Sequence, residues 1–278
     1  MRTYKSVVKT VGGNEGSKCC HRTRLDTYGR GCSHDCSYCY AKSLLDFRGM
    51  WDPQDPAVGD IDTIRKAVDK LPKEVVRMGG MTDCFQPCEV THRVTHKTLQ
   101  MLNEKSVPYL IVTKSALVAD YMDVLDKDLA HIQITVTTLD DDLAATYEKA
   151  SKPSDRIAAI KVLQREGYDV QLRLSPFIPE YMDTGKLAEQ GIDKVCVEFL
   201  RANGWIRRWF DTNYDEYIIK QDGYRHLPME RKIELLDRLH GFKELTVCED
   251  EDKAWQYWHD HVNPNPDDCC NLRRYDNG

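Results

Sequence analysis

Short apolar runs alternate with segments of helical periodicity from residue 25 to residue 201 of this chain. The apolar runs, which predict strands, cover residues 25–28, 74–80, 109–114, 131–139, 169–178 and 194–200. The segments with apolar residues three and four apart, which predict helices, cover residues 61–71, 91–104, 118–125, 143–150, 155–166 and 184–190. Because strands that alternate with helices are typical of βαβ units, the pattern predicts an α/β fold with a parallel sheet. Six such units are two fewer than a closed eight-fold barrel needs.

The two ends of the chain depart from this pattern. Residues 1–24 are basic and show no periodicity, so we expect an N-terminal arm without regular structure. Residues 202–278 contain predicted helices at 229–239 and around 255–261 and a predicted strand at 244–248. No repeat or low-complexity linker separates these parts. We therefore expect the arm at 1–24, the α/β unit at 25–201 and an extension of the same domain at 202–278.

Composition narrows the class of protein. The 278 residues suit one large domain, and 41% hydrophobic residues suffice for a core. A net charge of −6 argues against a broad polyanion-binding surface but is compatible with a local basic groove. Eleven cysteines without a secretory signal indicate metal or redox chemistry rather than disulfides. No stretch approaches the ~20 apolar residues of a membrane span, so we expect a soluble, cytoplasmic protein with no membrane partner.

Three of the cysteines, Cys32, Cys36 and Cys39, have the spacing C-x₃-C-x₂-C. Thiolates suit zinc or iron–sulfur clusters, and a structural zinc or a fully ligated cluster normally has four ligands. Three close cysteines therefore favour a cluster with one open iron. The alternative is a zinc knuckle completed by His34, although the short loop between Cys32 and Cys36 would struggle to aim that ring at the same metal.

The cysteine spacing, with the aromatic residue Tyr38 before the last cysteine, resembles the radical S-adenosylmethionine (radical SAM) superfamily. The resemblance implies a [4Fe–4S] cluster whose open iron binds SAM. It implies cleavage of SAM to a 5′-deoxyadenosyl radical, which abstracts a hydrogen atom from the substrate, and a reductant protein of the flavodoxin or ferredoxin type. It also implies a partial (β/α)₆ TIM-like barrel with the cofactor at the C-terminal ends of the strands. From the sequence of the extension itself, we expect it to cap the barrel mouth.

Four further blocks resemble the spore photoproduct lyase-like branch of that superfamily. They cover residues 82–89, 113–115, 135–140 and 175–179. The resemblance implies that Tyr38 lies near the adenine, and that the methionine part of SAM meets the remaining residues: Gly79, Gly80, Thr82, Asp83, Lys114 and Thr135. A lysine ammonium at a strand end suits a carboxylate. Lys114 as a solvated loop residue and Thr135 as an ordinary strand residue remain alternatives.

The chain departs from the lyase at the hydrogen-donating cysteine, where it has Gly80-Met81. Cys84 lies close by in the sequence and is one candidate for that role. The pair Cys269-Cys270 is another, because the tail after residue 262 could fold across the open barrel mouth. The pair Cys269-Cys270, or the separate group Cys19-Cys20-His21, could instead hold a second metal or cluster.

A nucleobase in DNA or RNA is the substrate class that the branch suggests, for repair or modification. A group of arginines and tryptophans could stack bases and hold phosphates or could pack the open edge of the barrel: Arg201, Trp205, Arg207, Arg208 and Trp209. A peptide- or metabolite-modifying radical SAM enzyme is the second hypothesis. A zinc-binding interaction module without catalysis is the third.

Overall fold

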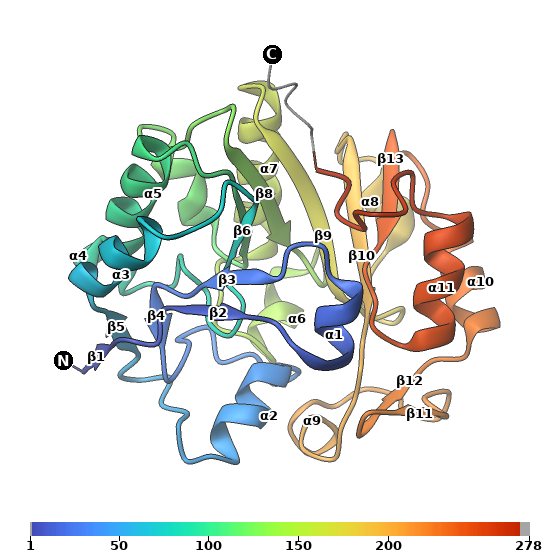
Figure 1. Cartoon of the computed structure of the whole chain (residues 1–278). Helices are drawn as coiled ribbons and strands as arrows, with labels where there is room; N and C mark the ends of the chain where they lie inside the picture. Colours follow the sequence, from blue (N-terminus) through green and yellow to red (C-terminus); the bar gives the residue numbers. More distant parts are fainter. Residues whose placement is uncertain (1, 273–278) are drawn as a thin grey trace.

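The computed structural model describes residues 2–272, which form an open, partly wound barrel around one large sheet (Figure 1). Eight strands follow the spatial order β13-β10-β9-β8-β7-β6-β3-β2. Their bounds are β2 Val8–Thr10, β3 Thr23–Leu25, β6 Val76–Met78, β7 Tyr109–Thr113, β8 Ala130–Thr135, β9 Asp169–Phe177, β10 Lys194–Phe199 and β13 Glu244–Val247. All neighbouring pairs are parallel except β2 and β3. Within the described residues β2 and β13 end the sheet at opposite edges, so the barrel is open, as the sequence predicted.

Helices connect the successive parallel strands, and each predicted helix overlaps one or two of them, with shifted ends. They are α3 Ile61–Val68, α4 Glu89–His92, α5 Val94–Glu104, the 3₁₀ helix η1 Ala116–Tyr121, α6 Asp141–Ala145, α7 Pro153–Arg165 and α8 Thr184–Ala188. The carboxylate of Asp60 accepts a hydrogen bond from the backbone N–H of Thr63 at 2.9 Å, which caps α3. None of the described helices has the length and apolar content that crossing a lipid bilayer requires.

Two predicted boundaries are wrong near the cysteine motif. The predicted strand 25–28 is divided between β3 and β4 Tyr28–Gly29, which belongs to a separate small sheet. The predicted helix 143–150 corresponds to α6, which ends at Ala145. The backbone beyond α6 bonds instead to the motif loop: Ser37 donates to the carbonyl of Tyr147 at 2.9 Å, and Lys149 donates to that of His34 at 2.7 Å.

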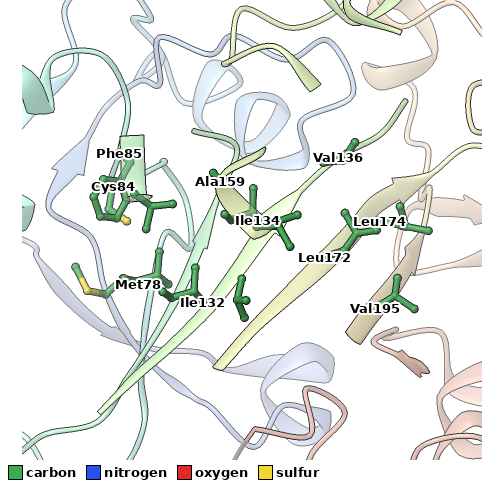
Figure 2. Packing of buried hydrophobic residues seen from close by; sticks show 14 of the residues in the cluster. Met78, Cys84, Phe85, Ile132, Ile134, Val136, Ala159, Leu172, Leu174 and Val195 are labelled. Carbon is green, nitrogen blue, oxygen red and sulfur yellow. The ribbon is translucent and has the colours of Figure 1, made fainter. Parts of the chain in front are cut away.

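The strands carry different residues on their two faces. Alternate apolar side chains such as Ile132, Ile134 and Leu172 pack toward the helices in the main core (Figure 2). The intervening positions carry buried polar side chains, and Gln133 both donates to Gln171 and accepts from Arg173, each at 2.7 Å. Because buried polar groups need partners, this network occupies the concave inner face, where the barrel leaves space for a site.

The N-terminal arm has more structure than the sequence predicted. Strand β1 Thr3–Tyr4 pairs with β5 Ala57–Gly59, β2 joins the main sheet, and α1 Gly13–Lys18 follows. A segment without apolar periodicity can still form an edge strand, because the partner strand supplies the hydrogen bonds.

The extension also joins the main sheet, through β13. It contains α9 Ile206–Trp209, β11 Ile219–Gln221, β12 Tyr224–His226, α10 Met229–Asp237 and α11 Asp252–His261, and its last six residues lie outside the described part. The segment after β10 reaches helix α2 Tyr40–Asp46 at the mouth: Arg201 lies over the ring of Tyr40 at 4.5 Å, and Asn203 donates to Ser43 at 3.0 Å.

The cysteine-bearing tail takes a different position from the predicted lid. Cys270 packs against Leu110, and its carbonyl accepts a hydrogen bond from Gln171 at 2.7 Å. Both partners lie near the first residues of their strands, whereas the motif loop lies at the last residues of the strands. The tail therefore closes the barrel interior from the end opposite the mouth.

Candidate active site

A single cavity gathers most of the predicted site residues at the C-terminal ends of the strands. It encloses about 1200 Å³ not filled by protein atoms, part of it open to solvent. Its walls include Cys32, Cys36, Cys39, Gly79, Gly80, Thr82, Asp83, Lys114, Thr135 and Cys269. Three predicted residues do not line this cavity: Tyr38, Cys84 and Cys270.

The motif loop that carries Cys32, Cys36 and Cys39 is held by separate parts of the chain. The amide N–H of Ser33 donates to Gln86 at 2.9 Å, and the segment after α6 makes the two backbone bonds described above. Gly31 has φ +151° and packs so tightly that a Cβ atom would lie 2.0 Å from the carbonyl oxygen of Asp52. Burial raises the pKa of all three motif thiols. A bound metal would displace the thiol protons. Because other parts of the chain hold the loop in place, it is a preformed place for a thiolate-ligated metal group.

A buried charge network supports the loop from behind. Tyr38 donates to Glu148, and Glu148 pairs with Arg156, whose side chain is fully buried. Burial acts to raise the pKa of Glu148, but the charges of Arg156 and Lys114 and the Tyr38 hydrogen bond outweigh it, so the pKa is lowered. Neither Glu148 nor Arg156 is part of a motif that the sequence reveals. Tyr38 lines a smaller pocket that adjoins the cavity and shares Cys36, Cys39 and Lys114 with it.

The turn after β6 brings backbone close to the cavity. Gly79 has φ +85°, and a Cβ atom there would lie 2.3 Å from the carbonyl oxygen of Val112, so only glycine fits. The carbonyl of Gly80 accepts a hydrogen bond from the hydroxyl of Tyr40 at 2.9 Å. These contacts fix a strand-end cradle that can approach a ligand with its backbone.

Asp83 follows this turn and is held as a carboxylate. It accepts hydrogen bonds from the hydroxyl of Thr113 and the backbone N–H of Lys114, both at 2.7 Å, and its Oδ2 lies 3.3 Å from Nε2 of His34. Burial acts to raise the pKa of Asp83, but His34 and the backbone donors have the larger effect, so the pKa is lowered. The neighbouring Thr82 donates its hydroxyl proton to the carbonyl of Tyr28 at 2.6 Å. Asp83 therefore presents a negative charge to the cavity.

Lys114 and Thr135 lie on the next two strand ends. The ammonium of Lys114 donates to the carbonyl of Ser175 at 2.9 Å and lies 5.3 Å from the ring centre of Tyr38. Thr135 ends β8 and is buried, and its carbonyl accepts from Arg156 at 2.7 Å. Lys114 thus lines the cavity with its ammonium held in place, rather than extending into bulk solvent.

Comparison with known proteins identifies the family. The sequence model of the radical SAM superfamily matches residues 27–189. The chain belongs to this superfamily. The match covers the motif loop, the Gly79-Gly80 turn and both Lys114 and Thr135.

The chain is also similar to curated proteins whose names state no activity. An uncharacterized protein of Mycobacterium tuberculosis is 25% identical over 202 residues, which cover 65% of this chain and 59% of the relative. An uncharacterized protein of Methanocaldococcus jannaschii is 26% identical over 197 residues, which cover 67% and 74% respectively. The chain thus spans about 59% of the length of the mycobacterial relatives.

Solved radical SAM structures share the fold. Spore photoproduct lyase complexed with dinucleoside spore photoproduct has a TM-score of 0.66 and 16% identity, over 88% of this chain and 81% of the lyase. A lyase mutant with bound AdoMet and the same dinucleoside has a TM-score of 0.64 and 16% identity, over 87% and 80%. The spore photoproduct lyase-like fold inferred from the sequence blocks is therefore confirmed.

The cavity residues fit the cofactors that the superfamily implies. Three thiols in one loop form a soft donor set with no fourth motif cysteine. The negative charge of Asp83 and the positive charge of Lys114 in one cavity suit a ligand that carries both an ammonium and a carboxylate, as the methionine part of SAM does. Buried Nδ1 of His34 has no hydrogen-bond partner in the described structure, so it could bond to a polar group of a bound ligand.

The predicted hydrogen-donor cysteines are separated by the fold. Cys84 is 1% exposed and packs beside Phe85 in the core (Figure 2), and its carbonyl accepts from Thr95 at 2.6 Å. Cys270 packs against Leu110 and Leu272. Cys269 is the one of these three cysteines that lines the cavity.

Two charged residues of the inner face complete the site and were missed from sequence. Glu198 lines the cavity and accepts from Arg173 and from the hydroxyl of Ser175, each at 2.7 Å. Burial opposes its ionisation, but the charge of Arg173 dominates and lowers the pKa of Glu198 to about 2. The signal that could have found Arg173 is its place, with Gln171, between apolar residues of a buried strand.

Proposed function

We propose that this chain binds a [4Fe–4S] cluster through Cys32, Cys36 and Cys39 and acts on a nucleobase-containing substrate. The observation that carries the proposal is one cavity that joins these three thiols to the Gly79 turn, Asp83 and Lys114. When bound, the cluster supplies the electron that cleaves SAM to the hydrogen-abstracting 5′-deoxyadenosyl radical.

The chain's own residues bind and orient SAM and exclude competing reactions. Asp83 accepts the ammonium, and Lys114 donates to the carboxylate, so two opposite charges fix the methionine end. Tyr38 packs beside the adenine, held by its hydrogen bond to Glu148. The sheet surrounds the reacting centre and limits access of water and stray hydrogen donors.

Aromatic and basic side chains at the mouth support a nucleobase substrate. Trp205 is 40% exposed, and its ring centre lies 5.9 Å from that of Trp209. Arg208 lies over Trp205 at 5.4 Å, and Lys42 of α2 lies over Trp209 at 5.1 Å. Such surfaces stack bases and neutralise phosphates. The dinucleoside in the lyase structure supports the same substrate class by similarity.

The test is anaerobic turnover with SAM and a reductant, either dithionite or a flavodoxin- or ferredoxin-type protein. We expect wild type to release 5′-deoxyadenosine and to lose this activity in the Cys32→Ala, Cys36→Ala, Cys39→Ala variant. With per-deuterated DNA and RNA oligonucleotides, we expect deuterium in the 5′-deoxyadenosine. A Cys88→Ala variant controls for loss of a thiol outside the motif.

Different results would contradict different parts. SAM cleavage by the triple variant would disprove the role of the motif cysteines. Deuterium transfer only from labelled peptides would disprove the substrate class and favour the peptide-modifying hypothesis. A colourless, zinc-containing wild-type protein after anaerobic purification would disprove the cluster and favour an interaction module.

A further inference from the structure

A second group of cysteines gathers inside the barrel, away from the motif loop. Its members, called here the tail cysteines, are Cys19, Cys248, Cys269 and Cys270. Cys19 follows α1, Cys248 follows β13, and the other two belong to the tail. Cys19 lies more than 200 residues before the other three in the sequence, and all four are free thiols.

The four thiols interact with one another. The thiol of Cys269 interacts with the thiols of both Cys248 and Cys270. Cys19 lies within electrostatic reach of Cys248 and Cys270. Cys19, Cys248 and Cys269 also line the cavity that holds the motif cysteines, while Cys270 is buried beside it. Four thiols that converge without a disulfide are a complete ligand set for a cluster.

Two arginines, the buried Arg173 and the half-buried Arg77, give this group a positive surrounding. Arg77 lines the same cavity, its nearest acidic neighbours include Cys19 and Cys248, and its Nε is buried without a hydrogen-bond partner in the described structure. Arg173 interacts with Cys248 and Cys270. A buried guanidinium with an unpartnered nitrogen is costly unless a negative group compensates it. Four thiolates around an iron–sulfur cluster carry a net negative charge and would supply that compensation.

Contacts that do not involve the thiols join the N-terminal arm to the tail. Asp268 pairs with Nε2 of His21 at 3.0 Å and accepts the backbone N–H of Cys270 at 2.9 Å and that of Leu272 at 3.1 Å. Gln171 binds the carbonyl of Cys270. The backbone is thus held by its own partners, which leaves the side chains of the tail cysteines available for ligation.

A smaller set of possible ligands lies beside the tail cysteines. One atom each of Cys20, His21 and Asp268 lies within 4.8 Å of the others, a spacing that suits a single ion such as zinc. However, the thiol-bearing Cys20 is exposed to solvent. Both carboxylate oxygens of Asp268 already accept hydrogen bonds from backbone N–H groups. The set explains how the tail is anchored, and it holds only three ligands.

We propose that Cys19, Cys248, Cys269 and Cys270 ligate a second iron–sulfur cluster, fully coordinated by cysteine, on the cavity wall opposite the motif loop. Each iron of a cluster binds a different thiolate, so a cluster accepts thiols that are spread wider than a single ion allows. The same is true of the motif cysteines, which form no compact single-ion set in the described structure. The proposal goes beyond the proposed function and does not depend on the substrate.

The test is metal analysis of the full chain, purified anaerobically and reconstituted with iron and sulfide. We expect about eight iron and eight sulfide per chain in wild type, and about four of each in the Cys32→Ala, Cys36→Ala, Cys39→Ala variant. That variant should retain an electron paramagnetic resonance signal after reduction, which the further change Cys269→Ser should alter or abolish. Cys248→Ala, Cys269→Ala on the wild-type background should retain about four iron.

Two controls distinguish ligation from folding. Cys84→Ala, Cys88→Ala removes two thiols outside both groups and should leave the iron content unchanged. Cys20→Ser should also leave it unchanged. Near-ultraviolet circular dichroism of each variant shows whether the fold is intact, and Cys269→Ser, which keeps the size of the side chain, gives a second reading where the double alanine variant fails to fold.

Two results would overturn the proposal. The first is about four iron per chain in wild type and none in the motif variant. This result would contradict the second cluster but would leave the proposed function intact. One zinc per chain that is lost in Cys20→Ser would assign the site to the Cys20, His21 and Asp268 set instead.

Discussion

At the scale of single residues, neighbours decide the charge state of the cavity walls. Asp83 is buried and Glu198 half-buried, yet their pKa values are lowered because His34, Arg173 and backbone N–H groups compensate the loss of water. Lys114 is positioned by the carbonyl of Ser175. The cavity therefore presents fixed charges of both signs, which suits a zwitterionic amino-acid group such as the methionine part of SAM.

We expect Lys114→Met to weaken SAM binding by about 1–3 kcal/mol, because the carboxylate loses a charge-assisted partner. Isothermal titration with SAM under anaerobic conditions measures this change. Lys152→Met removes an exposed lysine that precedes α7 and serves as the control. Equal affinity of the two variants would show that Lys114 does not bind SAM.

At the scale of elements, the segment between α6 and α7 acts as a support for the motif loop. Its backbone bonds to Ser37 and His34, Glu148 accepts from Tyr38, and Lys149 pairs with Asp35 at 3.2 Å. Glu148 in turn depends on Arg156 of α7. The loop conformation is thus coupled to α7 through one fully buried ion pair.

Replacing Arg156 with Met should destabilise the protein by about 3–5 kcal/mol, because Glu148 is left buried without its cation. Urea unfolding of the metal-free protein measures the loss. The matched change Arg165→Met lies on an exposed position of the same helix and should have little effect. A loss in Arg156→Met no larger than in Arg165→Met would show that the pair contributes no net stability.

At the scale of the whole molecule, the N-terminal arm and the tail meet through His21 and Asp268. The arm supplies His21 and the tail supplies Asp268, and both lie close to the inner face of the sheet. The arm also adds β2 at one edge of the sheet, and the extension adds β13 at the other. The arm and the extension are therefore parts of the barrel and of its interior.

Asp268→Ala should release the tail, because it removes the ion pair with His21 and the acceptors for Cys270 and Leu272. Limited proteolysis followed by mass spectrometry should show faster cleavage between residues 262 and 272 than in wild type. Asp267→Ala changes the exposed neighbouring aspartate and should be cleaved at the wild-type rate. Identical cleavage of Asp268→Ala and wild type would contradict the anchoring role.

The sequence by itself determined the features that are encoded locally. Alternating apolar and helical segments predicted six consecutive βα units, and each predicted strand from residue 74 onward lies in the sheet. The spacing of Cys32, Cys36 and Cys39 indicated a three-thiol site, and the blocks around Asp83, Lys114 and Thr135 indicated its surroundings. These signals work because periodicity and motif spacing are properties of about ten neighbouring residues.

Only the tertiary structure decided which residues share a wall of the cavity. Cys84 adjoins Asp83 in the sequence but turns into the core, whereas Cys269 follows it by 185 residues and reaches the cavity. The pairs Arg156 with Glu148 and His21 with Asp268 likewise depend on packing between elements. Such contacts have no local pattern, because the side chain that faces a cavity is selected by the packing of the whole sheet around it.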